Sequence, residues 1–309
     1  MSEKNIHKML IVGSGPAGLS AALYAARANL EPLVYTGMQL GGQVTDTHLV
    51  ENYPGFPDGV TGTDLVDAFQ KQAERFGARL EFDNVTEVDF SKRPYKLTTY
   101  AGEQYAETVI LATGANPRKL DVPGEDKFTG RGVSYCATCD GHFFQGKDVV
   151  VVGGGDSALE EGIFLTHFAK SVTVIHRRDE LRAGELLQQR AFDNPKVKFI
   201  WDTVVTEIMG EDIVQTIRLH NRKTGEDTEF TTEGIFIFIG HLPNTQLYQG
   251  QLEMDEQGYL VVDNYMHTNI EGVYAAGEVA DSHFRQVITS AAMGVSAAIE
   301  AIRFLDEQV

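Results

Sequence analysis

Short runs of apolar residues, each followed by a glycine-rich loop and a run of helical periodicity, organise the chain. Residues 8–12 (KMLIV) predict a short buried strand, and a glycine-rich loop begins at Gly13. Residues 19–30 (LSAALYAARANL) predict a helix, and residues 33–36 (LVYT) predict a second strand. Strand, loop, helix and strand together span about 30 residues, which is the unit that a dinucleotide-binding fold requires.

The same pattern occurs a second time. Residues 148–152 (DVVVV) predict a strand, the loop begins at Gly153, residues 159–169 (LEEGIFLTHFA) are helical in period, and residues 171–175 (SVTVI) predict the next strand. The two loops start 140 residues apart (153 − 13 = 140). This spacing indicates two similar nucleotide domains rather than a short-period repeat.

The domain boundaries follow from two apolar segments that end alike. Residues 108–114 (TVILATG) and 234–240 (GIFIFIG) each precede a crossover that contains proline. The tail after the second crossover, with a long Ala-rich helix predicted at about residues 287–305, is too small to be a domain and should complete the first one. We therefore predict an α/β fold with two Rossmann-like domains, in which residues 1–116 and 246–309 form the first and residues 117–245 form an inserted second.

Composition narrows the function classes. The chain has 309 residues, is 42% hydrophobic and carries a formal net charge of −18, so it should be globular and should repel nucleic acid and anionic membranes. No segment approaches the roughly 20 apolar residues that span a bilayer, and no signal peptide is recognised at the N-terminus. With only two cysteines the chain is not a secreted disulfide scaffold, and we expect it in the cytoplasm.

The two cysteines, Cys136 and Cys139, have the CxxC spacing that lowers a thiol pKa and brings two sulfurs within disulfide reach. A structural zinc ion needs four ligands, and the chain has no further cysteine and no HxxxH-like histidine pair, so we expect no metal. An inert buried pair is the other alternative. Asp140 follows directly, either as an acid that protonates a departing thiolate or as a helix cap, and the spacing leaves both open.

The residues that follow the second strand of each unit help to identify the nucleotide that its loop binds. His176, Arg177 and Arg178 follow the strand of the second unit, and Arg182 lies one helical turn further. Cations at this position suit a 2′-phosphate and predict NADPH rather than NADH, with a solvated basic turn as the alternative. The first unit has no acid at residues 35–37, so its ligand stays open. A flavin is required on chemical grounds, because nicotinamides deliver hydride, thiols react through sulfur, and flavin exchanges electrons with both.

Several motifs together carry a family resemblance. In chain order they are GSGPAG (13–18), GGQ (41–43), ENYPG (51–55), ATGA (112–115), CATCD (136–140), GGGDSA (153–158), HRR (176–178) with Arg182, and RQVITSAAMG (285–294). From end to end, the chain resembles the low-molecular-weight, bacterial-type thioredoxin reductases. The resemblance implies a cytoplasmic homodimer with FAD and NADPH as cofactors and thioredoxin as the protein substrate, with no nucleic acid or membrane partner.

The resemblance also implies site residues. The FAD-binding set would be Gly13, Gly15, Pro16, Ala17, Gly18, Gln43, Asn52, Ala112, Thr113, Gly114, Gly277, Glu278, Arg285 and Gln286. The NADPH-binding set would be Gly153, Gly155, Asp156, Ser157, Ala158, His176, Arg177, Arg178 and Arg182. Cys139 would face the flavin, Cys136 would attack the thioredoxin disulfide, and Asp140 would be the acid and base.

One position departs from the family pattern, and two other functions stay open. Glu278 stands where the family usually has aspartate after the glycine, so its bond to an FAD hydroxyl must be re-angled or bridged by water. One alternative function is the reduction of another small redox protein, glutaredoxin-like or peroxidase-linked. The other is a non-catalytic nucleotide-binding redox sensor, which the arginines and the CxxC together argue against.

Overall fold

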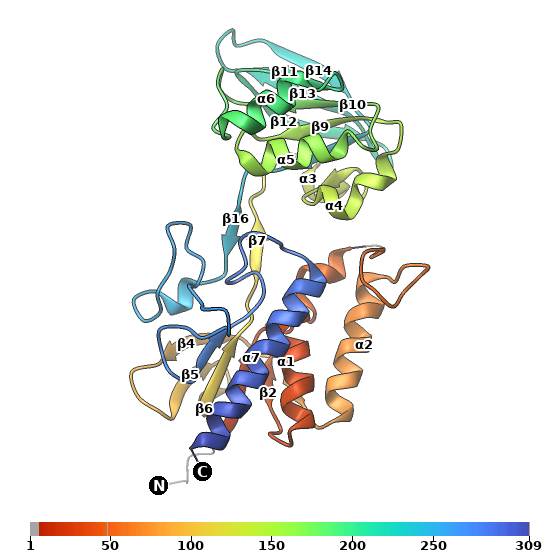
Figure 1. Ribbon diagram of the computed structural model, residues 1–309. Coiled ribbons are helices and arrows are strands. Elements are labelled where there is room, and N and C mark those ends of the chain that lie inside the picture. Colours follow the sequence, from red (N-terminus) through yellow and green to blue (C-terminus); the bar gives the residue numbers. More distant parts are fainter. Residues whose placement is uncertain (1–5, 48, 309) are drawn as a thin grey trace. The chain divides into compact units, whose positions relative to one another are not determined.

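The computed structural model describes residues 6–47 and 49–308. The chain divides into two compact units. Unit 1 consists of Met1–Asn116 and Leu242–Val309, and unit 2 of Pro117–His241, so unit 2 lies within the sequence of unit 1. Figure 1 shows the elements of both.

Unit 1 contains a seven-stranded sheet with the order β3-β2-β1-β6-β5-β4, in which β17 also pairs with β6. Its strands are β1 (Ile6–Val12), β2 (Leu33–Tyr35), β3 (Arg79–Glu81), β4 (Val85–Asp89), β5 (Tyr95–Thr99), β6 (Gly102–Leu111) and β17 (Val273–Ala275). The strands β1, β2, β3, β6 and β17 run parallel, whereas β4, β5 and β6 form an antiparallel meander. In the middle of the sheet, β2, β17 and residues 9–12 and 109–111 of β1 and β6 are apolar and buried, because both faces of the sheet are covered there.

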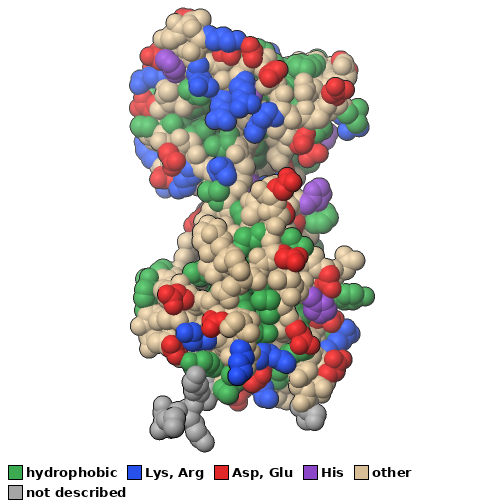
Figure 2. All heavy atoms as spheres, turned by 90° about the vertical axis from the view of Figure 1, so that its left-hand side faces the viewer, with side chains coloured by type: hydrophobic (Ala, Val, Ile, Leu, Met, Phe, Trp, Pro, Cys, Tyr) green, Lys and Arg blue, Asp and Glu red, His purple; other side chains and the backbone are tan. Residues whose placement is uncertain are grey.

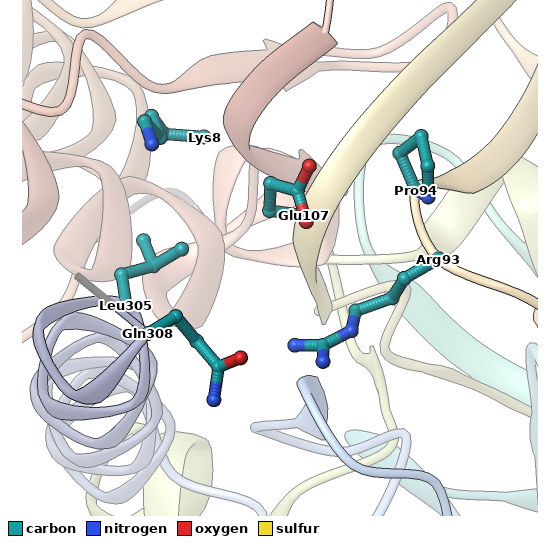
Figure 3. A pocket seen from close by; sticks show the side chains of 6 residues that line it. All are labelled: Lys8, Arg93, Pro94, Glu107, Leu305 and Gln308. Carbon is teal, nitrogen blue, oxygen red and sulfur yellow. The ribbon is translucent and has the colours of Figure 1, made fainter.

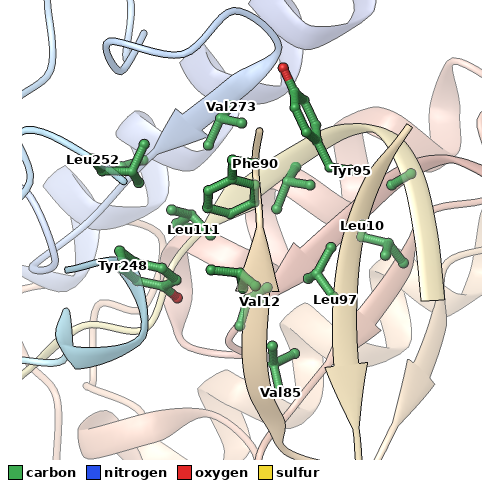
Figure 4. Close-up of a cluster of buried hydrophobic side chains, with 14 of the residues drawn as sticks. Leu10, Val12, Val85, Phe90, Tyr95, Leu97, Leu111, Tyr248, Leu252 and Val273 are labelled. Atoms are coloured by element: carbon green, nitrogen blue, oxygen red, sulfur yellow. The ribbon is translucent and has the colours of Figure 1, made fainter. Parts of the chain in front are cut away.

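Two hydrophobic clusters cover this sheet. Figure 4 shows part of the first, where Leu10, Val12 and Leu111 of the parallel strands pack with Leu97 and Tyr248. The second is built mainly from alanines of the helices on the other face. The helices of unit 1 are α1 (Pro16–Arg27), α2 (Gly62–Arg75) and α7 (Val287–Glu307), with short 3₁₀ turns η1 (Gly42–Asp46) and η3 (Gln246–Tyr248).

Helix α7 corrects one expectation from the sequence. By length and apolar composition it qualifies as a membrane-spanning candidate, although we expected no such segment. A core helix of the same composition passes the same test, and the contacts of α7 explain its small apolar residues. It packs along α1 (Figure 1), and a Cβ on Gly294 would lie 2.0 Å from the Ala17 oxygen, so the close approach of the two helices requires glycine.

Unit 2 combines a parallel sheet and an antiparallel sheet. The parallel one has the order β11-β10-β9-β15-β8, and the antiparallel one has the order β12-β13-β14. Its strands are β8 (Val133–Ser134), β9 (Asp148–Val152), β10 (Ser171–Ile175), β11 (Val197–Ile200), β12 (Thr203–Gly210), β13 (Val214–Asn221), β14 (Asp227–Thr231) and β15 (Gly234–Ile237). Its helices are α3 (Glu125–Phe128), α4 (Ala137–Asp140), α5 (Asp156–Leu165) and α6 (Glu185–Asp193), with the 3₁₀ turn η2 (Gly141–Phe144).

The two segments that connect the units pair with each other as strands β7 (Ala115–Pro117) and β16 (His241–Pro243). Each unit thus contains a parallel sheet whose strands alternate with helices. The predicted α/β class with two Rossmann-like units is confirmed.

Candidate active site

The two cysteines form a disulfide, Cys136–Cys139, with their Cα atoms 5.3 Å apart. Strand β8 leads into this turn, and Cys136 is the N-cap of the four-residue helix α4. The backbone N–H of Cys139 donates to Cys136 Sγ at 3.2 Å. Both cysteines of the chain are therefore in one short disulfide loop, which the CxxC spacing predicted.

Asp140 is the last residue of α4, and its carboxylate accepts a hydrogen bond from Ser134 Oγ at 2.6 Å. Burial raises the pKa of Asp140 above its usual range, while the Ser134 hydrogen bond and the charge of His142 oppose that rise. The side chain makes no capping hydrogen bond to η2, the helical turn that follows. The capping alternative is therefore not what the structure shows, and a carboxyl with a raised pKa next to a disulfide suits proton transfer.

Two contacts to the disulfide loop were not anticipated from the sequence. Ser134 reaches Asp140 from β8, and Glu161 Oε2 of α5 accepts a hydrogen bond from the Ala137 N–H at 3.1 Å. Neither side chain belongs to a motif, so no signal in the sequence could single them out. Glu161 thereby links α5, the helix after the second glycine loop, to the first turn of α4. Figure 1 shows α4 and α5 next to each other.

The first glycine loop has the geometry that a bound pyrophosphate needs. Gly13 has φ +110°, and a Cβ there would lie 2.2 Å from the Ala112 oxygen. A Cβ on Gly18 would lie 1.9 Å from the Gly13 oxygen, so strand and helix pack closely at this point. At Gly15, by contrast, a Cβ would meet just the Gly41 oxygen, at 3.9 Å, and α1 begins at the next residue. This open backbone at a helix N-terminus suits a phosphate group.

Distant segments of unit 1 are brought to this loop. The Gln43 amide donates to the Ala115 oxygen, next to residues 112–114, of which Ala112 supports Gly13. The Asn52 amide donates to Gln286 Oε1 at 3.2 Å, although 234 residues separate the two in sequence. The structure thus joins Asn52 and Gln286, two of the predicted FAD residues, and ties Gln43 to the residue that follows a third predicted segment. Thr113 Oγ1 donates to the Asn244 oxygen at 2.8 Å.

The segment 277–286 forms a tightly held loop before α7. Gly277 has φ +78°, and a Cβ there would lie 2.9 Å from the Ala17 Cβ, which places this loop against the start of α1. The buried Asp281 carboxylate accepts hydrogen bonds from three backbone N–H groups, those of residues 283, 284 and 285, at 2.8–3.1 Å. Burial raises the pKa of Glu278 to about 7, Arg285 opposes the rise, and Asp281 adds to it.

Replacing Glu278 with glutamine should flatten the pH dependence of stability. A carboxyl whose folded pKa is raised from 4.5 to about 7 contributes stability that is complete below pH 4.5 and is lost as the pH rises through 7. Between pH 4.5 and 8, we expect the free energy of unfolding of the wild type to fall by on the order of 2–3 kcal/mol more than that of Glu278→Gln, since one pKa unit corresponds to about 1.4 kcal/mol. Urea unfolding of both proteins at several pH values measures the difference, and parallel curves would show that Glu278 is not a buried acid.

The second glycine loop is built on the same plan with different supports. A Cβ on Gly153 would lie 2.4 Å from the Phe238 oxygen, and one on Gly154 would lie 2.3 Å from the His176 ring. Gly155 is open, with Arg182 Nη2 at 4.0 Å from the Cβ position. The open Gly155 precedes α5, which begins with Asp156, Ser157 and Ala158, so this loop also suits a pyrophosphate.

The basic segment is fastened to that loop by its backbone. The Arg182 N–H donates to the Gly154 oxygen at 2.7 Å, and Asp156 Oδ1 accepts from the Gly184 N–H at 2.7 Å. Arg177, Arg178 and Arg182 are exposed. Figure 2 shows Lys and Arg side chains gathered on one face of unit 2, the upper unit in that view. Exposed guanidinium groups beside an open glycine loop suit a phosphate-bearing nucleotide.

His176 differs from the arginines that follow it. It is 4% exposed and fills the space beneath Gly154, and burial lowers its pKa. Its Nε2 atom has no hydrogen-bond partner among the described residues. Buried polar atoms are normally hydrogen-bonded, and the position of His176 Nε2 under the loop is compatible with a bound nucleotide.

A pocket of about 410 Å³ lies elsewhere in unit 1 (Figure 3). Its lining comes from β1, the segment just before β5, the middle of β6 and the C-terminal end of α7 with the residue after it. It consists of Lys8, Arg93, Pro94, Glu107, Leu305 and Gln308. Ligands of open parallel sheets bind at the carboxyl ends of the strands, where both glycine loops lie. We therefore do not assign this pocket to the nucleotide chemistry.

The family model of the pyridine nucleotide-disulphide oxidoreductases matches residues 7–294. The chain belongs to this family. It is 48% identical to a thioredoxin reductase of Peptoclostridium litorale over 98% of both chains. It is 50% identical to a thioredoxin reductase of Streptomyces coelicolor, over 97% of this chain and 94% of that one. The crystal structure of thioredoxin reductase from Streptococcus pyogenes superposes with a TM-score of 0.93 and 44% identity, covering 98% and 99% of the two chains.

These matches confirm the resemblance that the motifs predicted. The chain is an oxidoreductase of the low-molecular-weight, bacterial-type thioredoxin reductase group, and the family uses a flavin and a nicotinamide nucleotide. The two glycine loops, one in each unit, supply two places with the geometry that such nucleotides need.

Proposed function

We propose that this enzyme reduces the disulfide of thioredoxin with electrons from NADPH, which pass through FAD and the Cys136–Cys139 disulfide. The observation that carries the proposal is the Cys136–Cys139 disulfide itself, with the buried Asp140 beside it. Near-full-length identity of 48–50% to proteins named thioredoxin reductase supports the choice of substrate.

Each unit would hold one nucleotide. Unit 1 would bind FAD through Gly13, Gly15 and Gly18, with Gln43, Asn52 and the segment 277–286 around it. Unit 2, which also carries the disulfide, would bind NADPH through Gly155 and the three arginines, with His176 beneath the loop. Bound FAD would supply a carrier that takes an electron pair as hydride from the nicotinamide and passes it to the disulfide.

The residues of the chain account for the transfer to the protein substrate. In the reduced enzyme, the Cys136 thiolate attacks one sulfur of the partner disulfide, which forms a mixed disulfide and releases one partner thiolate. The Cys139 thiolate then attacks the Cys136 sulfur, which restores the enzyme disulfide and releases the second partner thiolate. Two electrons and two protons move to the partner, and Asp140 would take up and return protons beside the sulfurs.

Assembly, location and partner exclusion follow as further parts of the proposal. The family resemblance supports a homodimer, and the cysteine usage supports a cytoplasmic location. The net charge of −18 disfavours nucleic acid and anionic membrane surfaces as partners. Glutaredoxin-like or peroxidase-linked proteins are the alternative substrates, since a partner with a less negative potential than thioredoxin, about −270 mV, also accepts these electrons.

The deciding experiment measures the oxidation of NADPH and the reduction of a disulfide dye that reports thiols, with and without added thioredoxin. We expect turnover that depends on thioredoxin, and bleaching of the flavin absorbance when NADPH is added without oxygen. Glutaredoxin in place of thioredoxin serves as the matched control. Faster turnover with glutaredoxin would transfer the proposal to that substrate, and a flavin that NADPH does not bleach would leave a sensor as the better description.

A further inference from the structure

Ser134 lies where the parallel sheet of unit 2 meets the disulfide loop. It ends β8 and is 4% exposed, and its backbone is fixed by the register of Ser134 with Phe236 in β15. From this position its hydroxyl contacts both Asp140 and the backbone of Cys136. No motif marks this residue, and the proposed mechanism assigns it no role.

The direction of its hydrogen bonds follows from the contacts. Ser134 Oγ lies 2.6 Å from Asp140 Oδ2 and 3.2 Å from the Cys136 oxygen, and a hydroxyl has one proton to donate. The shorter contact is to a carboxyl group, and the Cys136 oxygen already accepts from the Asp140 N–H at 3.2 Å. The proton therefore goes to Asp140, while Ser134 Oγ accepts from the Cys136 N–H at 3.1 Å.

We propose that Ser134 is a positioning residue of the dithiol chemistry, because its hydroxyl links the Asp140 carboxyl to the Cys136 backbone. The inference rests on the proposed role of Asp140. Among the described residues, Ser134 is the hydrogen-bond donor to that carboxyl. The rigid sheet thus holds an acid that would otherwise be held by the four-residue helix α4 alone.

The electrostatic consequence has a definite sign. A hydroxyl that donates to a carboxylate favours its ionised form and lowers its pKa, so loss of the hydroxyl makes Asp140 hold its proton to higher pH. Among the described residues, His142 on η2 also lowers the pKa of Asp140, and Glu161 on α5 binds the first turn of α4. Cys136 and Cys139 themselves ionise once the disulfide is reduced. All four residues stay unchanged in the variants below.

The test compares the wild type with Ser134→Ala, Ser134→Thr, Asp140→Asn and the double variant Ser134→Ala with Asp140→Asn, all as FAD-loaded enzymes. We expect Ser134→Ala to lower kcat for thioredoxin reduction by about tenfold, less than the 100- to 10,000-fold typical of losing an acid or base outright. The pH limb assigned to Asp140 should move to higher pH. Ser134→Thr, which keeps a hydroxyl, should resemble the wild type. In the Asp140→Asn background, Ser134→Ala should lower kcat little further, because the two residues act through the same hydrogen bond.

An infrared titration makes the result independent of turnover. The stretching band of a protonated buried carboxyl, absent in Asp140→Asn, should persist to higher pH in Ser134→Ala than in the wild type. If thioredoxin is not the substrate, all activity assays fail while the shifted band remains. An unshifted band, an equal tenfold loss in the Asp140→Asn background, or the same loss in Ser134→Thr would overturn the proposal.

Discussion

Cys136→Ser and Cys139→Ser should each reduce thioredoxin reduction to the background of an assay without enzyme. The two sulfurs of one disulfide store the electron pair together, and a single thiol has no neighbour with which to close a disulfide. The structure adds that both side chains lie in a four-residue turn, where serine keeps the size and hydrogen-bonding capacity of cysteine. The loss should therefore come from missing redox chemistry and not from a disrupted fold.

The two variants should differ in what they accumulate. Cys139→Ser keeps Cys136, so its attack on thioredoxin should stop at a mixed disulfide that non-reducing electrophoresis detects. Cys136→Ser should form little of this species if Cys136 is the attacking sulfur. Gln145→Ala, an exposed change just after η2, serves as the control that keeps both sulfurs. Full activity of the variant lacking both sulfurs would end the proposal that they carry the electrons.

Local patterns predicted the elements that are buried on both faces. Strands β9 and β10 begin and end at the residues that the apolar runs indicated, because each run is bounded by polar residues or glycine. Strand β6 starts six residues earlier than expected (108 − 102 = 6). Its first half pairs with β5 in the antiparallel meander and carries polar residues such as Glu103, so the apolar run marked only its second half.

The antiparallel sheet β12-β13-β14 was not anticipated. Its strands mix exposed polar and buried apolar residues, and β12 has register shifts at Val205/Glu207 and Met209/Gly210, which interrupt the alternation by which half-buried strands are recognised. Burial was likewise hidden from the sequence at His176. It follows an apolar strand and precedes two exposed arginines, yet it packs beneath Gly154.

The site could be predicted as a set of residue types but not as a set of contacts. The glycine spacing and CxxC are local, so their geometry follows from a few neighbouring residues. The Asn52–Gln286 hydrogen bond joins residues far apart in sequence, and the Ser134–Asp140 bond joins a strand end to a helix end. Such contacts depend on how the elements pack, which periodicity and spacing do not determine.

Replacing Arg177, Arg178 and Arg182 together with glutamine should abolish the preference for NADPH over NADH. All three side chains are exposed, and a hydrogen bond to a charged group contributes about 1.5–3 kcal/mol. The loss of even two of the three contacts to the 2′-phosphate should lower kcat/KM with NADPH by about 100-fold or more, since 1.4 kcal/mol corresponds to a factor of ten. NADH lacks the phosphate, so its kcat/KM should change by less than about threefold on the same reasoning.

The structure makes this comparison interpretable. The segment that carries Arg182 is held by backbone hydrogen bonds, Arg182 N–H to the Gly154 oxygen and Gly184 N–H to Asp156, so truncating the side chains leaves the loop supported. Arg190→Gln, at an exposed position on α6, controls for the loss of positive charge from unit 2. A disturbed fold would lower activity with both nucleotides alike, whereas a lost phosphate contact lowers it with one. The ratio of the two kcat/KM values therefore separates binding from folding, and an unchanged ratio would assign the arginines to a solvated surface turn.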